Sequence, residues 1–557
     1  MTGSDFDDPR LTLGHFTVDC ARRFGARTAV VGEEHSLDYA ALDVEVRQLA
    51  RALVAAGVVK GTRVAVWMPN GPDWIVAAFA VASVGGVLVP VNTFAVPVER
   101  DHILRHSDAS LLLLQPELGK HSFLDDLLAD HPEIERGRPG ALRVPGLPQL
   151  RRVVASRRAE PRGGVETLDG LRARGASVDE ATFDALREAV HPSDDGCIIY
   201  TSGTTSQPKG VLHAQRTPVL QGQRFADFMR FGPEDRVYTT YPFFWTAGIA
   251  MSICGVFTAG GRLLTHEMFE AGAALDLMER ERATGIHAWP HQQKALGEHP
   301  SAAGRDLSSL AKIELGSPLA AIAGVEKDVY GVGASYGLSE TFTICSAIPA
   351  DSPVEQRRAC NGRPWPGMQL RIVDPESGAP LGPGEEGEIA VKGVTLMKGY
   401  YKVAPEHVFD AEGYFRTQDG GSIDAEGFLH WTGRLSNLIK TGGANVSPVE
   451  ITELLEAHPE LKLGIPVGLE HPTLGQVIVL CAVAVAGAEP SEAGVRGWLR
   501  ERLAPYKVPK RVLFFRADEL SYTGNQKVQT APLAEAALKR LRQERAEIDG
   551  YVFEPAI

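Results

Sequence analysis

The sequence predicts an α/β protein in which a large N-terminal domain, residues 1–434, precedes a small α+β C-terminal domain, residues 435–557. Strand-like and helix-like apolar segments alternate over the first 115 residues, and again from residue 197 to about residue 345. Such alternation is typical of parallel sheets with crossover helices. Short strands between glycine-rich turns follow in residues 365–432. We therefore expect the N-terminal domain to hold two α/β subdomains and a β-rich subdomain.

The first elements are indicated by hydrophobic periodicity. Residues 42–56 have apolar side chains at helical spacing and are followed by Gly57, which predicts a helix that ends there. Residues 62–68 and 111–114 are short runs rich in valine or leucine, which predict two buried strands.

An uncharged run of 18 residues, 74–91, is at the edge of the length that a membrane-spanning helix needs. Gly85, Gly86 and Pro90 divide this run. It is therefore interpreted as a buried helix over 74–84 and a buried strand over 87–91, and no membrane partner is expected.

Residues 136–165 have a different composition, with eight arginines and no aromatic residue. A nucleic-acid patch is one interpretation of such a segment. Without aromatic side chains for stacking, and with an acidic remainder of the chain, a solvated connector is the favoured interpretation.

The later elements are indicated by turns and caps. Residues 369–373 and 387–391 are short apolar runs between glycine-rich turns, as expected of a β-rich subdomain. Ser447-Pro448-Val449-Glu450 is a capping box with proline at the first helical position, and Pro459 bounds the helix that it begins.

Composition excludes several functional classes. With 70 acidic against 57 basic residues the net charge of the 557-residue chain is −13, which argues against nucleic acid and anionic membranes as partners. The six cysteines form no CxxC pair, so neither a disulfide framework nor a zinc site is expected. The acidic N-terminus has no apolar segment of the kind found in signal peptides, and a cytoplasmic location is expected. Monomer and homodimer both stay open.

The strongest local motif is the segment 200–210, YTSGTTSQPKG, which follows the apolar strand 197–199. It has five Ser/Thr hydroxyls, two glycines and Lys209 at the end of a strand. Small residues allow backbone N–H groups to approach an anion, hydroxyls donate to phosphate oxygens, and lysine adds positive charge. The segment is not a Walker A sequence, but it predicts a phosphate-binding loop.

This loop resembles the phosphate loop of the adenylate-forming (ANL) superfamily, which includes acyl- and aryl-CoA synthetases, peptide adenylation domains and firefly luciferase. Five further segments resemble the superfamily's motifs in the same order: 241–248 (YPFFWTAG), 336–340 (YGLSE), 413–419 (GYFRTQD), 433–450, and 522–528 around Lys527. The resemblance covers roughly residues 10–530. It implies ATP-dependent conversion of a carboxylic acid to an acyl adenylate with release of pyrophosphate, followed by transfer to an acceptor, expected to be coenzyme A.

The resemblance also implies roles for individual residues. Lys527 is the expected catalytic lysine, Glu340 and Thr204 are the expected Mg²⁺ ligands, and Arg434 lies beside the ribose. The other implied ATP-binding residues are Thr201, Ser202, Gly203, Thr205, Lys209, Gly316, Ser317, Pro318, Ser335, Tyr336, Gly337, Ser339 and Asp419. These residue types suit the implied reaction, because attack of a carboxylate on the α-phosphate brings two anions together and needs preorganised positive charge.

The acid-binding pocket and the second half-reaction are assigned on the same basis. The implied acyl-pocket residues are Phe244, Trp245, Thr246, Gly248 and His291. In the superfamily the C-terminal domain is mobile and rotates at a hinge, here Ser436, so that a second loop replaces the catalytic lysine. The implied residues of that loop are Lys440, Gly442 and Gly443.

Three positions depart from the superfamily pattern. Ser436 stands where Asp or Lys is usual at the hinge, and Gln418 and Gln526 replace glycines before the ribose aspartate and the catalytic lysine. Glutamine restricts the backbone angles that glycine allows, so local loop geometry is expected to differ. These departures concern domain rotation and thioester formation more than adenylation.

The pocket segments favour one class of acid. Trp245 stands where many CoA ligases have histidine or another aromatic residue, and the segment 288–293 is more polar than a long acyl tunnel requires. An aromatic, cyclic or short-to-medium functionalised acid is therefore favoured over a long fatty acid.

Three functional classes are compared. The favoured one is an AMP-forming acyl- or aryl-CoA synthetase. The second keeps adenylation but transfers the acyl group to a carrier protein, an amine or an inorganic nucleophile. The third, a non-catalytic nucleotide-binding scaffold, is disfavoured because the lysines and carboxylates implied by the resemblance are all present. A G-x-S-x-G match at 333–337 lacks the apolar strand that a hydrolase nucleophile elbow needs.

Overall fold

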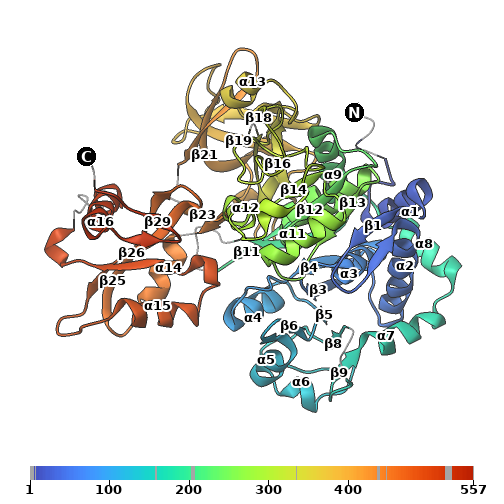
Figure 1. The fold of residues 1–557 in the computed structure, drawn as a ribbon. Helices are drawn as coiled ribbons and strands as arrows, with labels where there is room; N and C mark the ends of the chain where they lie inside the picture. The colour runs from blue at the N-terminus through green and yellow to red at the C-terminus, as the bar shows by residue number, and fades with distance from the viewer. Residues whose placement is uncertain are drawn as a thin grey trace.

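The computed structural model describes residues 6, 8–156, 160–201, 207–333, 335–435, 439–446, 448–520, 528 and 530–555, without the side chains of 432–434, 445, 449 and 453. Figure 1 shows a large N-terminal body, blue through yellow, with a separate C-terminal unit beside it in orange and red. The predicted fold class is confirmed, because mixed α/β layers form the body and a smaller α+β unit follows.

The first α/β subdomain is built on an eight-stranded sheet. Its strands pair in the order β20 (Gly399–Tyr400), β11 (Lys209–Ala214), β10 (Asp195–Thr201), β4 (Val87–Pro90), β3 (Arg63–Trp67), β5 (Leu111–Leu114), β8 (Arg152–Ala155) and β9 (Val165–Thr167). The pairs from β10 to β9 are parallel, whereas β10–β11 and β11–β20 are antiparallel.

The second α/β subdomain is built on a five-stranded sheet. Its strands pair in the order β14 (Gly285–His287), β12 (Arg236–Thr239), β13 (Arg262–Thr265), β1 (Thr28–Val31) and β2 (Ser36–Asp38). One apolar core joins the inner faces of both sheets to α1 (Leu13–Phe24), α2 (Tyr39–Ala55), α3 (Pro72–Ser83) and α9 (Arg216–Met229). These helices therefore share one core with the facing sides of the two sheets.

The outer faces of the two sheets have their own helices. A second core packs α4 (Pro97–His106) and α5 (Phe123–Asp130) on the eight-stranded sheet. A third core packs α11 (Ala271–Arg280) and α12 (Pro290–Gly297) on the five-stranded sheet. Each sheet is thus covered on both faces, as parallel sheets require.

The β-rich subdomain is an antiparallel sheet of β18 (Met368–Val373), β19 (Gly387–Gly393), β21 (Phe415–Ile423) and β22 (Leu429–Arg434). A smaller sheet of β15 (Ser335–Leu338), β16 (Thr343–Ala347) and β17 (Arg363–Pro364) packs in the same core. Residues that the sequence assigns to the nucleotide lie in β15, in the short helix Ser339–Thr341 that follows it, and within β21.

The C-terminal unit is a second, smaller sheet with helices. Its strands are β24 (Ala444–Val446), β23 (Ile439–Thr441), β26 (Gly475–Ala484), β25 (Leu461–His471) and β27 (Arg511–Phe514). Its helices are α14 (Pro448–Leu455), α15 (Glu492–Arg500) and α16 (Thr530–Glu544). The unit contacts the N-terminal body through the turn between β23 and β24 and through residues 505–507.

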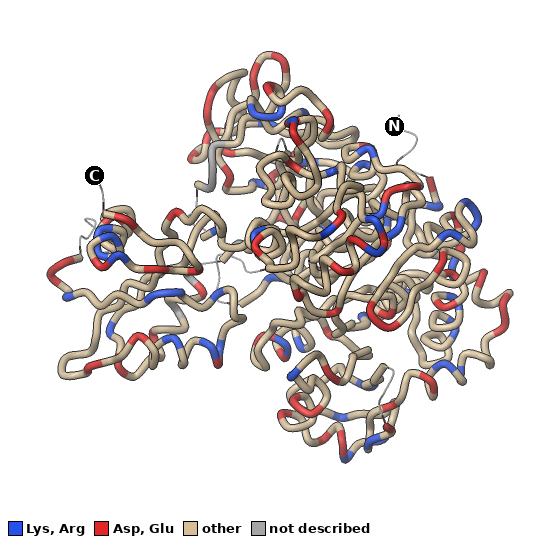
Figure 2. Tube along the Cα trace, viewed as in Figure 1, with Lys and Arg blue, Asp and Glu red and all other residues tan. Residues whose placement is uncertain are grey.

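Most predicted elements are confirmed, and one interpretation is wrong in part. The uncharged run 74–91 does divide into α3 and β4, and among the described helices none is long and apolar enough to cross a membrane. The arginine-rich segment 136–165 is not merely a solvated connector, because Val153 and Val154 of β8 are buried against β5. Figure 2 shows acidic and basic residues interspersed over both units, consistent with the modest negative net charge.

Candidate active site

A cavity of about 940 Å³ lies at the end of β10, where the subdomains meet the C-terminal unit. Its wall combines side chains from β10, β11, β20 and β21, from the turn after β15, and from the turn that follows β23. Because these segments are far apart in the sequence, the cavity exists only in the folded chain.

Both ends of the predicted phosphate loop lie at the cavity. β10 ends at Thr201 and β11 begins at Lys209, and these two residues pair in the antiparallel ladder. Both line the cavity. The loop residues Ser202, Gly203, Thr204 and Thr205 lie outside the described residues, so their contacts with phosphate and Mg²⁺ stay predictions.

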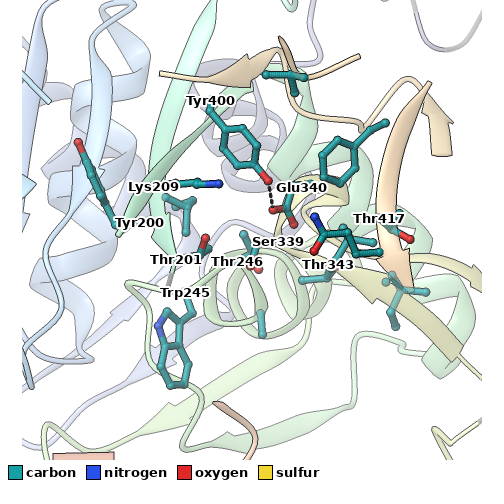
Figure 3. A pocket seen from close by; sticks show the side chains of 18 of the residues that line it. Tyr200, Thr201, Lys209, Trp245, Thr246, Ser339, Glu340, Thr343, Tyr400 and Thr417 are labelled. Carbon is teal, nitrogen blue, oxygen red and sulfur yellow. Dashed lines mark hydrogen bonds between the residues drawn. The ribbon is translucent and has the colours of Figure 1, made fainter. Parts of the chain in front are cut away.

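Glu340 and Lys209 approach each other around Tyr400 (Figure 3). The Tyr400 hydroxyl donates to Glu340 Oε1 over 2.7 Å, and Lys209 Nζ lies 5.1 Å from the centre of the Tyr400 ring. The backbone carbonyl of Glu340 accepts from the Met397 amide, which fixes the short helix Ser339–Thr341. A carboxylate and an ammonium group therefore face one cavity, as a site for Mg²⁺ and phosphate requires.

Asp419 lies behind the cavity wall with Tyr336. The Tyr336 hydroxyl donates to Asp419 Oδ2 over 2.8 Å, and both side chains are buried. Burial and the Asp419 charge raise the pKa of the Tyr336 phenol well above its ordinary value, so the phenol keeps its proton. Among the described residues, Thr417 and Gln418 line the cavity and Asp419 does not. Ribose binding by Asp419 thus stays a prediction, as does that by Arg434, whose side chain is not described.

Gln418 keeps the backbone conformation that glycine usually supplies. Its φ is +61°, in the left-handed region, and its amide donates to Glu388 Oε1 over 2.8 Å. Such a conformation costs a non-glycine residue of the order of 1–3 kcal/mol. The glutamine therefore adopts a left-handed conformation within β21 and adds a side chain to the cavity wall.

The remaining nucleotide residues divide into two groups. Ser335, Gly337 and Ser339 line the cavity. Gly316, Ser317 and Pro318 do not lie in the described cavity wall and instead form a turn, in which the Leu319 amide donates to Ser317 Oγ over 3.3 Å. Their role in nucleotide binding stays a prediction.

An aromatic wall separates this cavity from a second one. Trp245 and Trp289 line both cavities together with Tyr506 and Ala444 of the C-terminal unit. The Trp245 ring centre lies 6.5 Å from that of Trp289 and 6.2 Å from that of Tyr506, both edge to face. Such pairs are favourable geometries for aromatic rings, so the wall is well packed.

The predicted acyl-pocket residues are distributed along this wall. Thr246 lines the first cavity, and Phe244 and His291 line the second. Burial and the neighbouring Lys510 lower the pKa of His291, which favours the neutral ring. Gly248 begins a π-helix, where a Cβ atom would lie 2.7 Å from the Phe243 Cα atom, so only glycine fits.

The C-terminal unit presents its glycine turn to the site. Gly442 and Gly443, with φ of +56° and +81°, form the turn between β23 and β24, and Gly443 lies against the Trp289 ring. Lys440 is turned away from the cavity, with Nζ 3.7 Å from the Trp431 ring centre. Ser436 and Lys527 lie outside the described residues. Gly443 therefore meets the cavity wall, whereas the role of this loop in the second half-reaction stays a prediction.

The second cavity, of about 1000 Å³, extends from the aromatic wall between the two units. Charged side chains of both signs line it: Arg100, Lys294, Arg500 and Lys510, and Asp126, Glu267, Glu298 and Asp549. Several are paired with each other, as Lys510 is with Asp549 at 2.8 Å.

The sequence matches the family model for "AMP-binding enzyme" over residues 18–401, and that for "AMP-binding enzyme C-terminal domain" over residues 450–527. The chain belongs to the AMP-binding enzyme family. It is thus a member of the adenylate-forming superfamily and an AMP-forming ligase, as the order of its motifs predicted.

Curated relatives and solved structures of this AMP-binding enzyme span nearly the whole chain. A feruloyl-CoA synthase from Amycolatopsis sp. is 31% identical over 521 residues, 93% of this chain and 97% of its own length. An indoleacetate–CoA ligase from Aromatoleum aromaticum is 31% identical over 526 residues, with the same coverage. The structure of the amide bond synthetase McbA from Marinactinospora thermotolerans has a TM-score of 0.75 and 27% identity, and covers 94% of this chain and 99% of its own.

Two residues of this AMP-binding enzyme's site were missed by sequence reasoning. Tyr400 reaches the site because β20 pairs with β11 across nearly 190 intervening residues, and no local pattern signals that pairing. Tyr506 reaches it from the other unit. The aromatic pair Tyr400-Tyr401 beside a glycine was the one available signal for the first of them.

Proposed function

We propose that this enzyme activates a carboxylic acid with ATP and Mg²⁺, releases pyrophosphate, and transfers the acyl group from the adenylate to coenzyme A. The observation that supports it is that Lys209, Tyr400 and Glu340 lie close together in one cavity. This cavity shares an aromatic wall with a second one. Relatives named as CoA synthases and ligases support the same acceptor.

In the proposed first step the site residues neutralise the negative charge of ATP and stabilise the charge that develops in the transition state. Lys209 neutralises phosphate oxygens, and Glu340, oriented by the Tyr400 hydroxyl, is a Mg²⁺ ligand together with Thr204. Lys527 stabilises the charge that develops when the substrate carboxylate attacks the α-phosphate. Preorganised donors of this kind typically contribute about 10²–10³ in rate each.

The proposed acid is aromatic, cyclic or short and functionalised. Trp245 and Trp289 offer ring faces and edges along the wall, and Thr246 adds a hydroxyl to the same cavity. Flat rings pack against such surfaces, whereas a long alkyl chain needs an apolar tunnel. The names of the feruloyl and indoleacetate relatives agree with this class.

Division of the chain into 1–434 and 435–557 belongs to the same proposal. So does a cytoplasmic location, which is supported by the six free cysteines. The acid, ATP and the acceptor are the proposed partners.

The test is product analysis by mass spectrometry with ATP, Mg²⁺ and a panel of ferulate, indoleacetate, benzoate and palmitate, with and without CoA. An acyl-CoA product from an aromatic acid is expected. Glu340→Gln is expected to lower pyrophosphate release about 100-fold or more, while the exposed Glu426→Gln serves as the matched control. Palmitate as the fastest substrate contradicts the acid class, and AMP formation that is indifferent to CoA contradicts the acceptor.

An amine is the second candidate acceptor. Among the described residues that line the second cavity, four carry positive and four carry negative charge, whereas CoA carries several phosphates that an excess of cations would favour. The similarity to an amide bond synthetase points the same way. An amide product formed from an added amine, with no thioester formed from CoA, would support this candidate.

A further inference from the structure

A buried ion cluster joins the two units. Lys507 Nζ lies 2.8 Å from Glu99 Oε1 and 2.8 Å from Glu450 Oε1. The side chains are 3%, 9% and 3% exposed, respectively. Glu99 belongs to α4 of the N-terminal body, whereas Lys507 and Glu450 belong to the C-terminal unit.

Such a cluster is stable only while its charges stay paired. Removing an ion from water costs several kcal/mol, which paired charges offset and an unpaired charge does not. Burial alone would lower the pKa of Lys507, but the surrounding Tyr506, Glu99 and Glu450 raise it, so the ammonium form persists. Burial raises the pKa of Glu450 against the effect of Lys507. The charges therefore depend on one another.

The carboxylates of Glu99 and Glu450 differ in whether their contact with Lys507 depends on the arrangement of the two units. Glu450 and Lys507 lie in one unit and move together, so their contact survives any rigid-body rotation. Glu99 lies on the other unit, and its contact with Lys507 exists only in the arrangement seen here. The Glu99–Lys507 pair is thus specific to one domain arrangement, while the Glu450–Lys507 pair is not.

The residue before Lys507 connects the cluster to the site. The Tyr506 side chain is one of those that line both cavities, and its ring meets Trp245 edge to face at 6.2 Å. In the same arrangement Gly443 lies against Trp289. Fixing Lys507 on Glu99 therefore fixes Tyr506 and the glycine turn on the aromatic wall.

We propose that Glu99 and Lys507 are positioning residues for acyl transfer: their ion pair holds the C-terminal unit in the arrangement that delivers the acyl group, and it takes no part in adenylation. This inference rests on the proposed function, in which the unit must leave this arrangement for Lys527 to act. Glu99 is the informative position because only its contact is made and broken by the movement.

The test compares the two half-reactions in Glu99→Gln. The substitution removes the charge at nearly constant volume and leaves an acceptor oxygen. Acyl transfer from preformed adenylate is expected to fall about tenfold or more in single turnover, while pyrophosphate release without acceptor changes less than about twofold. Glu99→Asp, which keeps the charge on a shorter side chain, is expected to recover part of the loss.

Asp101→Asn is the matched control. Asp101 lies on the same helix, but its ion pairs, with Arg100 and His131, stay within the N-terminal body. Both half-reactions are expected to stay within about twofold of the unsubstituted enzyme. Equal loss of both half-reactions in Glu99→Gln would show a folding defect and overturn the proposal, as would unchanged acyl transfer.

Amide hydrogen exchange keeps the test independent of the acceptor. Backbone protection of residues 97–106 and 505–508 is expected to fall in Glu99→Gln and not in Asp101→Asn. Unchanged protection in Glu99→Gln overturns the ion-pair proposal whatever acceptor is used. An enzyme that transfers to no acceptor, yet loses protection in Glu99→Gln, instead contradicts the proposed function and leaves the interface role supported.

Discussion

Replacing Gly443 by alanine tests the arrangement of the two units most directly. The added Cβ atom would lie 2.5 Å from Cδ2 and 2.7 Å from Cζ3 of the Trp289 ring. A Cβ atom essentially never approaches other atoms below about 3.0 Å, and Trp289 is held by Tyr241, whose ring centre is 4.6 Å away. The clash is therefore relieved mainly by moving the C-terminal unit away from the wall.

The magnitude follows from two terms. The φ of +81° costs alanine about 1–2 kcal/mol in every arrangement of the units. Overpacking against Trp289 costs a further 1–3 kcal/mol, about 5- to 150-fold, only where the turn meets the wall. Acyl transfer from preformed adenylate should thus slow by about that factor in single turnover. Adenylation, measured by pyrophosphate release without acceptor, should change little, because the proposed rotation moves the turn away from Trp289 for that step.

Gly442→Ala separates the two terms. Gly442 also has a positive φ, +56°, but a Cβ atom there would meet His291 at 3.5 Å and Leu474 at 3.8 Å, both ordinary van der Waals distances. This variant carries the backbone term without the clash. Equal acyl transfer in the two variants would refute the contact with Trp289, and a loss of adenylation in Gly443→Ala would refute the assignment of this turn to the second half-reaction.

Three further predictions concern single contacts. Tyr400→Phe removes the donor to Glu340 and should lower pyrophosphate release about 10- to 100-fold, since a hydrogen bond to a charged group contributes about 1.5–3 kcal/mol; an unchanged rate would exclude that role. Burial lowers the pKa of His287 to about 3, below the value near 6.5 of an unfolded chain, so its stabilisation is complete above pH 6.5 and is lost as pH falls. The free energy of unfolding of the unsubstituted enzyme should therefore fall between pH 7.5 and pH 5, and in His287→Asn, which keeps a partner for Ser252, this fall should be about 2 kcal/mol smaller. Urea titration at the two pH values measures both falls, and equal falls would contradict the prediction. Gly248→Ala overpacks the start of the π-helix and should lower the melting temperature in calorimetry, and an unchanged temperature would contradict the close approach.

The sequence was informative wherever a local pattern determines the structure. The strand that ends at Thr201, the division of the run 74–91, and the strand Leu111–Leu114 follow from runs of apolar residues and from glycine and proline positions. Their side chains are buried on both faces, so no alternative period competes. The order of the motifs could also be recognised from the sequence, because each motif is a continuous segment of the chain.

Features that depend on long-range pairing were not readable. The strand Arg152–Ala155 lies among arginines, and its three apolar residues are buried where it pairs with β5 on one side and β9 on the other. Lys507 is flanked by turn residues, and a lysine in that setting is ordinarily solvated. Its burial depends on Glu99, 408 residues away in sequence. Local sequence carries no signal for such pairs.

The shared aromatic wall implies that choice of acid and choice of acceptor are physically coupled in this enzyme. Trp245 and Trp289 belong to both cavities, so under the proposed function a side chain that shifts to fit a larger acid in one cavity also changes the wall of the other. Tyr506 completes the same wall, and under the proposed inference it does so while the neighbouring Lys507 is paired with Glu99. Under the proposed function, the acid, the acceptor and the C-terminal unit therefore all contact the same aromatic wall. A change in the fit of any one of them is expected to alter the contacts of the other two.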